Sequence, residues 1–268
     1  MKLVTFSNLG FMGELGNQMF QVAATVGHAR KHGLREKFPR WECKISGNDY
    51  SKIFSNPPDQ TLTPLDYDGP TQIFSYQDLL YKEIPKTDTH LDLSGYFQSE
   101  KYFDHCREEI RSIFKPSEEI NSYLLSKYPD LTADHDFVAV HIRTGKRDRS
   151  DYDVHAYCTK GYLEEAFLDY EDNRKFIIFS DRVEVAKEIL PEGRDYTFVT
   201  GEKNYIDLFL LTHFKNYIIS ASTFGWWGCW LSKHKSTKVT IMKNWFNPMG
   251  AKSYLNNNNI SPDIWKKI

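Results

Sequence analysis

An α/β fold built on parallel sheet is the class that the sequence predicts, and two patterns support it. Between residues 137 and 242, short apolar runs alternate with segments of helical periodicity, so that single helices separate successive strands. Strands in that order pair in parallel. Near the start, the apolar run 3–6 leads through a glycine-punctuated loop into a helix, which is how a Rossmann-like half begins. The length of 268 residues suffices for one large domain or two of ordinary size.

Composition excludes several classes of protein. A formal net charge of −2 gives no global attraction to nucleic acid or to anionic lipid. No apolar run approaches the roughly 20 residues of a membrane-spanning helix, and the first residues carry no cleavage signal. The cysteines lack metal-ligand spacing and indicate reduced, buried thiols; they are Cys43, Cys106, Cys158 and Cys229. We therefore expect a soluble, cytoplasmic protein that binds no nucleic acid and has no transmembrane segment, while docking on a membrane through a partner stays open.

The first half is expected to cover residues 1–130. Its loop is punctuated by Gly10, Gly13 and Gly16. The next helix is expected over residues 19–31, ending at Gly33. The glycine spacing differs from the dinucleotide fingerprint G-x-G-x-x-G, so it predicts no dinucleotide site. Asn17 and Gln18 are expected to project their amides into a cleft at the carboxyl end of the strand, and the alternative is a polar helix start without a ligand.

The remainder of this half is less regular. Prolines interrupt residues 34–90, where the segments 45–54 and 71–81 are expected to hold short strands or helices whose type and bounds the pattern does not fix. A strand is expected at residues 91–93, and helices at 106–114 and 120–128. The short polar segment 129–136 is interpreted as the hinge to the second half, which is expected to cover residues 131–268.

The second half follows the alternation closely. Strands are expected at 137–142, 176–179, 196–199, 217–219 and 239–242, and helices at about 161–170, 183–190, 205–212 and 224–231. Between Tyr205 and Leu231, a short buried strand ends in small hydroxyl residues that open a helix, with Thr223 as the expected cap. Amides, hydroxyls and the helix dipole converge at such a corner and favour an anion. A capped helix without a ligand is the alternative.

Polar residues follow three of the expected strands at their carboxyl ends, where parallel sheets bind ligands. They are His141 and Arg143 after the first strand, Ser180 and Asp181 after the second, and Ser222, Thr223 and Phe224 after the third. This set suits a phosphate-bearing nucleotide, because Arg143 can hold one diphosphate oxygen and the hydroxyl corner another. Asp207 or Asp181 can accept hydrogen bonds from a guanine edge.

Each of these residues also has a structural alternative. Arg143 would then form a surface ion pair, and His141 would be a satisfied core histidine. Asp207 would be a polar residue on an exposed helix flank. The prediction of a site therefore depends on the convergence of residues from several strands and on no single member.

Five stretches of the chain resemble the α-1,2-fucosyltransferases of glycosyltransferase family 11, in the family's order. They are GELGNQMFQ at 13–21, GYFQSEKYF at 95–103, HIR at 141–143, FSD at 179–181, and the segment from Asp207 to Trp227 that ends in STFGWW. Together they span nearly the whole chain, and the GNQMFQ and STFGWW pieces are the most specific.

The resemblance implies an inverting, metal-independent transferase that moves L-fucose from GDP-fucose to the 2-hydroxyl of a galactoside, without a cofactor. It also implies a GT-B-like fold, with two Rossmann-like halves facing a central cleft. The nucleotide sugar would lie in the second half, and the oligosaccharide or glycan acceptor on the side of the first. Arg143 would hold the diphosphate and Asp207 would read guanine. Asn17, next to Gly16, would face the diphosphate and the fucose.

The chain departs from the family pattern HxRRGDY, because Thr144 and Lys146 replace the second arginine and the aspartate. No general base for the acceptor is fixed by the pattern. Asp151 and Asp153 are the preferred candidates, and His155 is a third. The alternative functions are transfer of another GDP-linked deoxyhexose, such as rhamnose, and binding of nucleotide or carbohydrate without catalysis.

Overall fold

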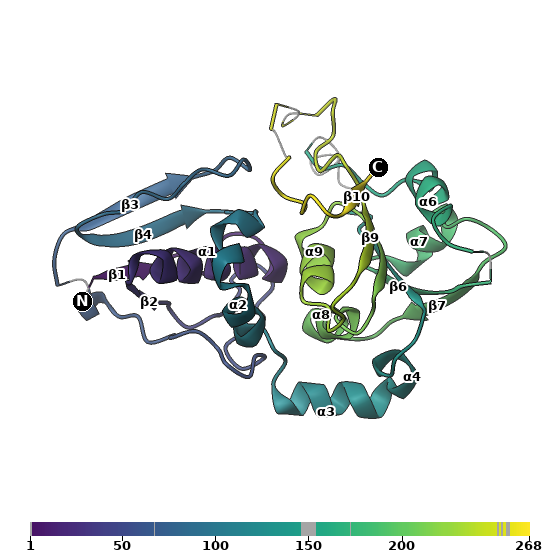
Figure 1. Ribbon diagram of the computed structural model, residues 1–268, viewed down its shortest axis with the longest axis horizontal. Helices are drawn as coiled ribbons and strands as arrows, with labels where there is room; N and C mark the ends of the chain where they lie inside the picture. Colours follow the sequence, from purple (N-terminus) through teal and green to yellow (C-terminus); the bar gives the residue numbers. More distant parts are fainter. Residues whose placement is uncertain are drawn as a thin grey trace. The chain divides into compact units, whose positions relative to one another are not determined.

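The computed structural model describes residues 2–66, 68–145, 154–171, 173–250, 252, 254–255 and 258–268 (Figure 1). The chain divides into two compact units. Unit 1 comprises residues 1–121 with 258–262, and unit 2 comprises 122–257 with 263–268. The division falls inside α3 (Glu118–Lys127), and the segment predicted as the hinge contains the short helix α4 (Pro129–Thr132). The roles assigned to the two halves stay predictions.

Unit 1 is built on a parallel sheet with the strand order β2-β1-β4-β3. Its strands are β1 (Leu3–Thr5), β2 (Arg35–Lys37), β3 (Thr71–Tyr76) and β4 (His90–Gly95). The long helix α1 (Leu15–His32) packs against β1 and β2 and is buried along most of its length. It ends at Gly33 with a left-handed φ of 63°, as predicted. The helix α2 (Arg107–Ile113) follows the sheet.

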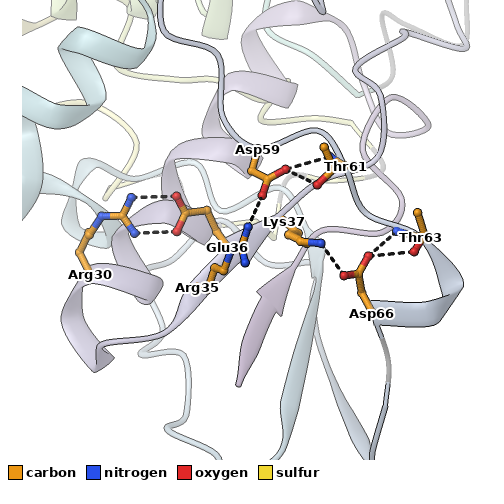
Figure 2. Close-up of polar contacts among 8 residues, drawn as sticks. All are labelled: Arg30, Arg35, Glu36, Lys37, Asp59, Thr61, Thr63 and Asp66. Carbon is orange, nitrogen blue, oxygen red and sulfur yellow. Dashed lines mark hydrogen bonds and ion pairs between the residues drawn. The ribbon is translucent and has the colours of Figure 1, made fainter. Parts of the chain in front are cut away.

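The edge strand β2 was not predicted, because three consecutive charged residues carry no period-two apolar signal. Each of these residues has an ionic partner (Figure 2): Arg35 pairs with Asp59, Glu36 with Arg30, and Lys37 with Asp66. The two aspartates also accept hydrogen bonds from threonines of their own loop. Two of these ion pairs therefore tie the irregular chain after β2 to the strand, and the pair of Glu36 with Arg30 ties the strand to α1. Charge on an edge strand also opposes pairing with another chain.

Unit 2 contains a parallel sheet with the order β10-β9-β8-β5-β6-β7. Its strands are β5 (Val138–Ile142), β6 (Lys175–Ser180), β7 (Asp195–Val199), β8 (Asn216–Ile219), β9 (Lys238–Ile241) and β10 (Lys266–Lys267). Its further helices are α6 (Lys160–Phe167), α7 (Val183–Ile189), α8 (Asn204–Leu211) and α9 (Thr223–Trp230). The predicted alternation and parallel pairing are confirmed, and β10 is the addition.

Helices cover both faces of this sheet, with α8 and α9 on one side and α6 and α7 on the other (Figure 1). On the α6 side, Val138, Val140 and Ile142 of β5 join one apolar cluster with Leu163 and Phe167 of α6. All residues of β5 are buried, as expected for a central strand covered on both faces. Helices thus cover both faces of the sheet. We use the word rim for the side of the sheet where the carboxyl ends of its strands lie.

Close backbone packing against α1 yields a test of the fold. A methyl group at Gly27 would lie 2.2 Å from the backbone oxygen of Tyr102. Alanine normally stabilises a helix relative to glycine, but here we expect Gly27→Ala to lower the free energy of unfolding by about 1–3 kcal/mol through overpacking. Gly161→Ala in α6 is the matched control, because no atom lies within 4 Å of the added methyl group. Thermal unfolding of the two variants measures the difference, and equal melting temperatures would contradict the packing described.

Candidate functional site

The carboxyl ends of β5 and β8 are tied together by backbone and side-chain hydrogen bonds. The strands pair in register, with His141 opposite Ile219. Beyond that pair, the Ser220 N–H donates to the His141 carbonyl at 3.0 Å. The Arg143 N–H donates to the Ser220 hydroxyl oxygen at 2.8 Å. The buried Ser220 therefore fixes the backbone from which the Arg143 side chain departs.

The end of β6 contributes Asp181, which contacts two residues that follow β5. Its Oδ1 accepts hydrogen bonds from the Thr144 N–H at 2.9 Å and the Thr144 hydroxyl at 3.0 Å. Its Oδ2 lies 3.0 Å from Arg143 Nη1. The Arg143 side chain is 50% exposed, so the guanidinium remains accessible at the rim. We call Arg143, Thr144, Asp181 and Ser220 the strand-end cluster.

The neighbouring His141 is buried against the first turn of α9. Its ring centroid lies 5.5 Å from that of Phe224. Burial lowers the pKa of His141 to about 4; the Asp181 carboxylate opposes this shift, and the nearby Arg143 charge adds a smaller lowering effect. The imidazole is therefore neutral near pH 7, and its Nδ1 has no hydrogen-bond partner among the described residues. His141 shapes the rim here, while its predicted contact with a nucleotide stays a prediction.

The helix α9 begins at the same rim, directly after β8. Ser222 is the N-cap residue, and the Trp226 N–H donates to its carbonyl at 2.9 Å. The prediction of Thr223 as the cap was therefore wrong by one residue, because the two adjacent hydroxyl residues are equally good candidates by type. The first amides of a helix have no partner within the helix. At this corner they lie beside the half-buried side chains of Ser222, Thr223 and Phe224.

Close contact between α9 and the sheet depends on a glycine. A methyl group at Gly225 would lie 2.3 Å from Ile219 Cγ2 and 3.0 Å from His141 Nδ1. Only a residue without a side chain lets the helix start this near the strand ends. These close contacts therefore explain why a glycine, Gly225, stands within the STFGWW stretch.

Asp207, in the first turn of α8, has a carboxyl group that is largely removed from water. Its Oδ1 is buried and has no hydrogen-bond partner among the described residues. Burial, with a smaller contribution from the Glu202 carboxylate, raises the pKa of Asp207 to about 7. An acceptor in this state is suited to a ligand that brings its own N–H donors. Its assignment to guanine stays a prediction.

Glu202 is held beside Asp207 by residues of α3 and the turn that follows it. Its carboxylate accepts hydrogen bonds from the Tyr128 hydroxyl at 2.6 Å and the Tyr123 hydroxyl at 3.0 Å, and it also pairs with Lys127. Burial alone would raise the pKa of Glu202, but these three contacts lower it. A negative charge therefore stands near Asp207. No sequence pattern marked Glu202, because its partners are distant in the chain.

In unit 1, the two amides after the glycine loop have different environments. Gln18 is fully buried; its side chain donates to the Gly13 carbonyl at 2.6 Å and accepts from the Trp41 indole at 2.7 Å. The expectation that Gln18 projects toward a ligand is therefore wrong, because it braces the loop. Asn17 is less buried, and its Oδ1 accepts from Gln98 Nε2 at 2.7 Å. Gly16 and Asn17 lie within α1, which begins at Leu15 rather than at residue 19.

Two of the predicted catalytic residues, Asp151 and Asp153, lie outside the described residues, as does Lys146. The third candidate base, His155, is exposed, and its ring stacks on Phe246 with centroids 5.7 Å apart. Across the part of the chain that the structure describes, no three His, Cys, Asp or Glu side chains gather to hold a metal ion. The same part contains no helix with the length and apolar character to cross a membrane.

A parallel α/β sheet with an exposed arginine and a helix start at its rim is an arrangement typical of proteins that bind nucleotides or phosphate groups. The sequence model of glycosyl transferase family 11 matches residues 5–260, and the chain belongs to this family. The predicted membership is thus confirmed, and with it the α/β fold of GT-B type.

The chain is similar to curated glycosyltransferases. It is 32% identical over 189 residues to an alpha-1,2-colitosyltransferase of Escherichia coli, covering 66% of this chain and 62% of that protein. It is 27% identical over 242 residues to galactoside alpha-(1,2)-fucosyltransferase 1 of Leontocebus fuscicollis, covering 82% of this chain and 64% of that protein. The matches thus span less than two thirds of these relatives' lengths.

A solved structure shares the fold. NodZ alpha-1,6-fucosyltransferase from Bradyrhizobium, soaked with GDP-fucose, aligns with a TM-score of 0.57 at 15% identity, covering 86% of this chain and 92% of that one. At this identity the likeness concerns the fold.

The raised pKa of Asp207 predicts a stability effect that depends on pH. With a pKa of about 7 in the folded protein, the carboxyl binds its proton more tightly folded than unfolded, so the wild type loses stability as pH rises from about 4 to 7. We expect Asp207→Asn to raise the free energy of unfolding at pH 8 by about 1–3 kcal/mol, and not below pH 4.

Urea unfolding of both proteins at the two pH values measures this difference. Asp195→Asn, at the exposed start of β7, is the control and should change the free energy little at either pH. A variant at Asp207 that destabilises the protein at pH 8 but not below pH 4 would show that the carboxylate has a stabilising partner and that its burial is not the dominant effect.

Proposed function

We propose that the protein is an inverting glycosyltransferase that moves L-fucose from GDP-fucose to the 2-hydroxyl of a galactoside acceptor. The observation that carries this proposal is the corner of unit 2 where Arg143 and the start of α9 follow two adjacent strands, β5 and β8. A guanidinium and a set of helix amides at one rim are suited to a diphosphate. The family and the names of the two curated relatives support the reaction class and the α-1,2 linkage.

In the proposed reaction, the bond between the anomeric carbon of fucose and the diphosphate breaks while the acceptor hydroxyl attacks from the opposite face. The sugar passes through an oxocarbenium-like state, and negative charge grows on the leaving diphosphate. Arg143 and the α9 amides stabilise that charge, because they are in place before the reaction starts. The acceptor proton passes to a general base, for which Asp151, Asp153 and His155 stay the candidates.

Reading of the donor base is assigned to Asp207. Guanine presents two adjacent N–H donors, and a carboxylate with a buried, unpartnered oxygen accepts from such an edge. Asn17 and Gly16 of unit 1 are assigned to the diphosphate and fucose, with Gln98 holding the Asn17 amide in orientation. Ser180, Ser222, Thr223 and Phe224 complete the proposed donor site. The acceptor is a galactose-terminated oligosaccharide or glycan.

No metal or other cofactor is included in this proposal, because Arg143 and the helix dipole supply the positive charge that the leaving group needs. We also propose a cytoplasmic location, supported by Cys43, Cys106, Cys158 and Cys229, all of which are free thiols in the structure. The second candidate function is transfer of a different GDP-linked deoxyhexose. The 32% identity to a colitosyltransferase favours this alternative specifically.

A donor screen tests the function. We expect transfer from GDP-fucose to a galactose-terminated acceptor in the presence of EDTA, with NMR of the product showing an α-1,2 linkage. GDP-colitose, GDP-rhamnose and an adenine-based nucleotide fucose serve as comparison donors. Faster transfer from GDP-colitose would assign the protein to the second candidate function. Tight GDP binding without transfer from any donor would contradict catalysis.

The role of Arg143 gives a second test. We expect Arg143→Ala to lower kcat/KM by about 10²- to 10³-fold, because one preorganised charge contact to the leaving group is lost. Arg143→Lys should recover part of the rate, since lysine supplies the charge without the bidentate geometry. Arg174→Ala is the control, because Arg174 pairs with Asp136 at the opposite end of the same sheet. A kcat/KM of Arg143→Ala close to that of the wild type would contradict the proposed role of Arg143.

A further inference from the structure

The two oxygens of the Asp181 carboxylate are both engaged by residues that follow β5. The pairing of β5 with β6 places Ile142 opposite Ser180, so the next residues of the two chains, Arg143 and Asp181, leave the sheet side by side. Thr144 fills Oδ1 with two hydrogen bonds of 2.9 and 3.0 Å, and Arg143 Nη1 lies 3.0 Å from Oδ2. The contacts therefore follow directly from the register of the sheet.

The backbone around Asp181 is itself fixed. The Ser180 hydroxyl accepts the Arg182 N–H at 3.1 Å, which stabilises the turn between β6 and α7. Thr144 is buried, with 6% of its surface exposed. A rigid carboxylate thus faces a long, half-exposed arginine side chain.

We infer that Asp181 is a positioning residue that acts through Arg143, and that Thr144 fixes Asp181 for this task. This inference rests on the proposed function, in which Arg143 holds the donor diphosphate. A guanidinium carries five N–H donors, and the contact with Asp181 leaves donors for a phosphate. A preset arginine loses less freedom when the donor binds, and its geometry is already near that of the transition state.

The alternative role for Asp181, as an acceptor for the guanine edge, is disfavoured by the same contacts. Guanine would have to displace the Thr144 donors or the Arg143 guanidinium from the carboxylate. The same contacts give Thr144 a role at a position where related sequences are expected to carry a second arginine. Its hydroxyl and backbone amide together orient the acid that orients the remaining arginine.

A double-mutant cycle tests this inference, with GDP affinity and kcat/KM as readouts. Asp181→Asn keeps the shape and an acceptor for Thr144 but removes the charge that faces Arg143. We expect it to lower kcat/KM by about 10- to 100-fold in the wild-type background. In the Arg143→Ala background the same substitution should change kcat/KM by less than about twofold, because the group through which Asp181 acts is gone.

Two further variants keep the test decisive. Asp136→Asn is the matched control, because Asp136 pairs with Arg174 and Lys215 at the other end of the sheet, and it should leave kcat/KM unchanged. Thr144→Val removes one hydrogen bond to Asp181. It should lower kcat/KM by about 2- to 10-fold, and again only when Arg143 is present. If Asp181→Asn fails to fold, Thr144→Val takes its place in the double-mutant cycle.

The outcomes separate this inference from the proposed function. Equal losses with and without Arg143 would overturn the positioning role and identify Asp181 as an independent ligand. A selective loss of GDP over IDP affinity in Asp181→Asn would also overturn it, in favour of base recognition. If Arg143→Ala alone has no effect, the proposed function itself fails, whatever Asp181 does.

Discussion

The pairing of β5 with β8 in the middle of the second sheet is the constraint on which the candidate site depends. Both strands are covered on two faces by helices, so their register cannot shift without moving buried side chains to the wrong face. That register brings the His141 carbonyl to the Ser220 amide and the Arg143 amide to the Ser220 hydroxyl. The packing of apolar side chains in the core thereby fixes the backbone positions from which the polar side chains at the rim extend.

At this rim, burial sets the charge state of His141, and pairing with Asp181 offsets part of the positive charge of Arg143. Burial keeps His141 neutral beside the strand-end cluster, in which Arg143 carries the positive charge. Asp181 compensates part of that charge from one side. The amides at the start of α9 add a partial positive charge on the adjacent strand end without an ionisable group.

The burial of the Asp207 carboxyl group works against folding. A buried carboxyl oxygen without a partner is unfavourable for folding, and the same burial raises the pKa of Asp207. The nearby Glu202 increases it, although Glu202 itself is well satisfied by donors from Tyr123, Tyr128 and Lys127. Polar groups left unsatisfied at a rim favour a ligand that completes them.

The sequence predicted the parallel α/β alternation of unit 2, because each element there has a clear apolar period. It did not predict β2, whose residues are all charged, and for β3, with its mostly exposed side chains, it gave only a short strand or helix within residues 71–81. For the candidate site, residue type and position after a strand pointed to Arg143, but only the structure separated Gln18, which braces the loop, from Asn17. Contacts such as Thr144 with Asp181 depend on sheet register between distant segments, which no local pattern encodes.

The most direct test of this account is a crystal structure of the protein with GDP bound. The account predicts the diphosphate within hydrogen-bond distance of the Arg143 guanidinium and the first amides of α9, with the guanine edge at Asp207. A nucleotide bound at a different edge of the sheet, or a diphosphate that leaves Arg143 without contact, would contradict it.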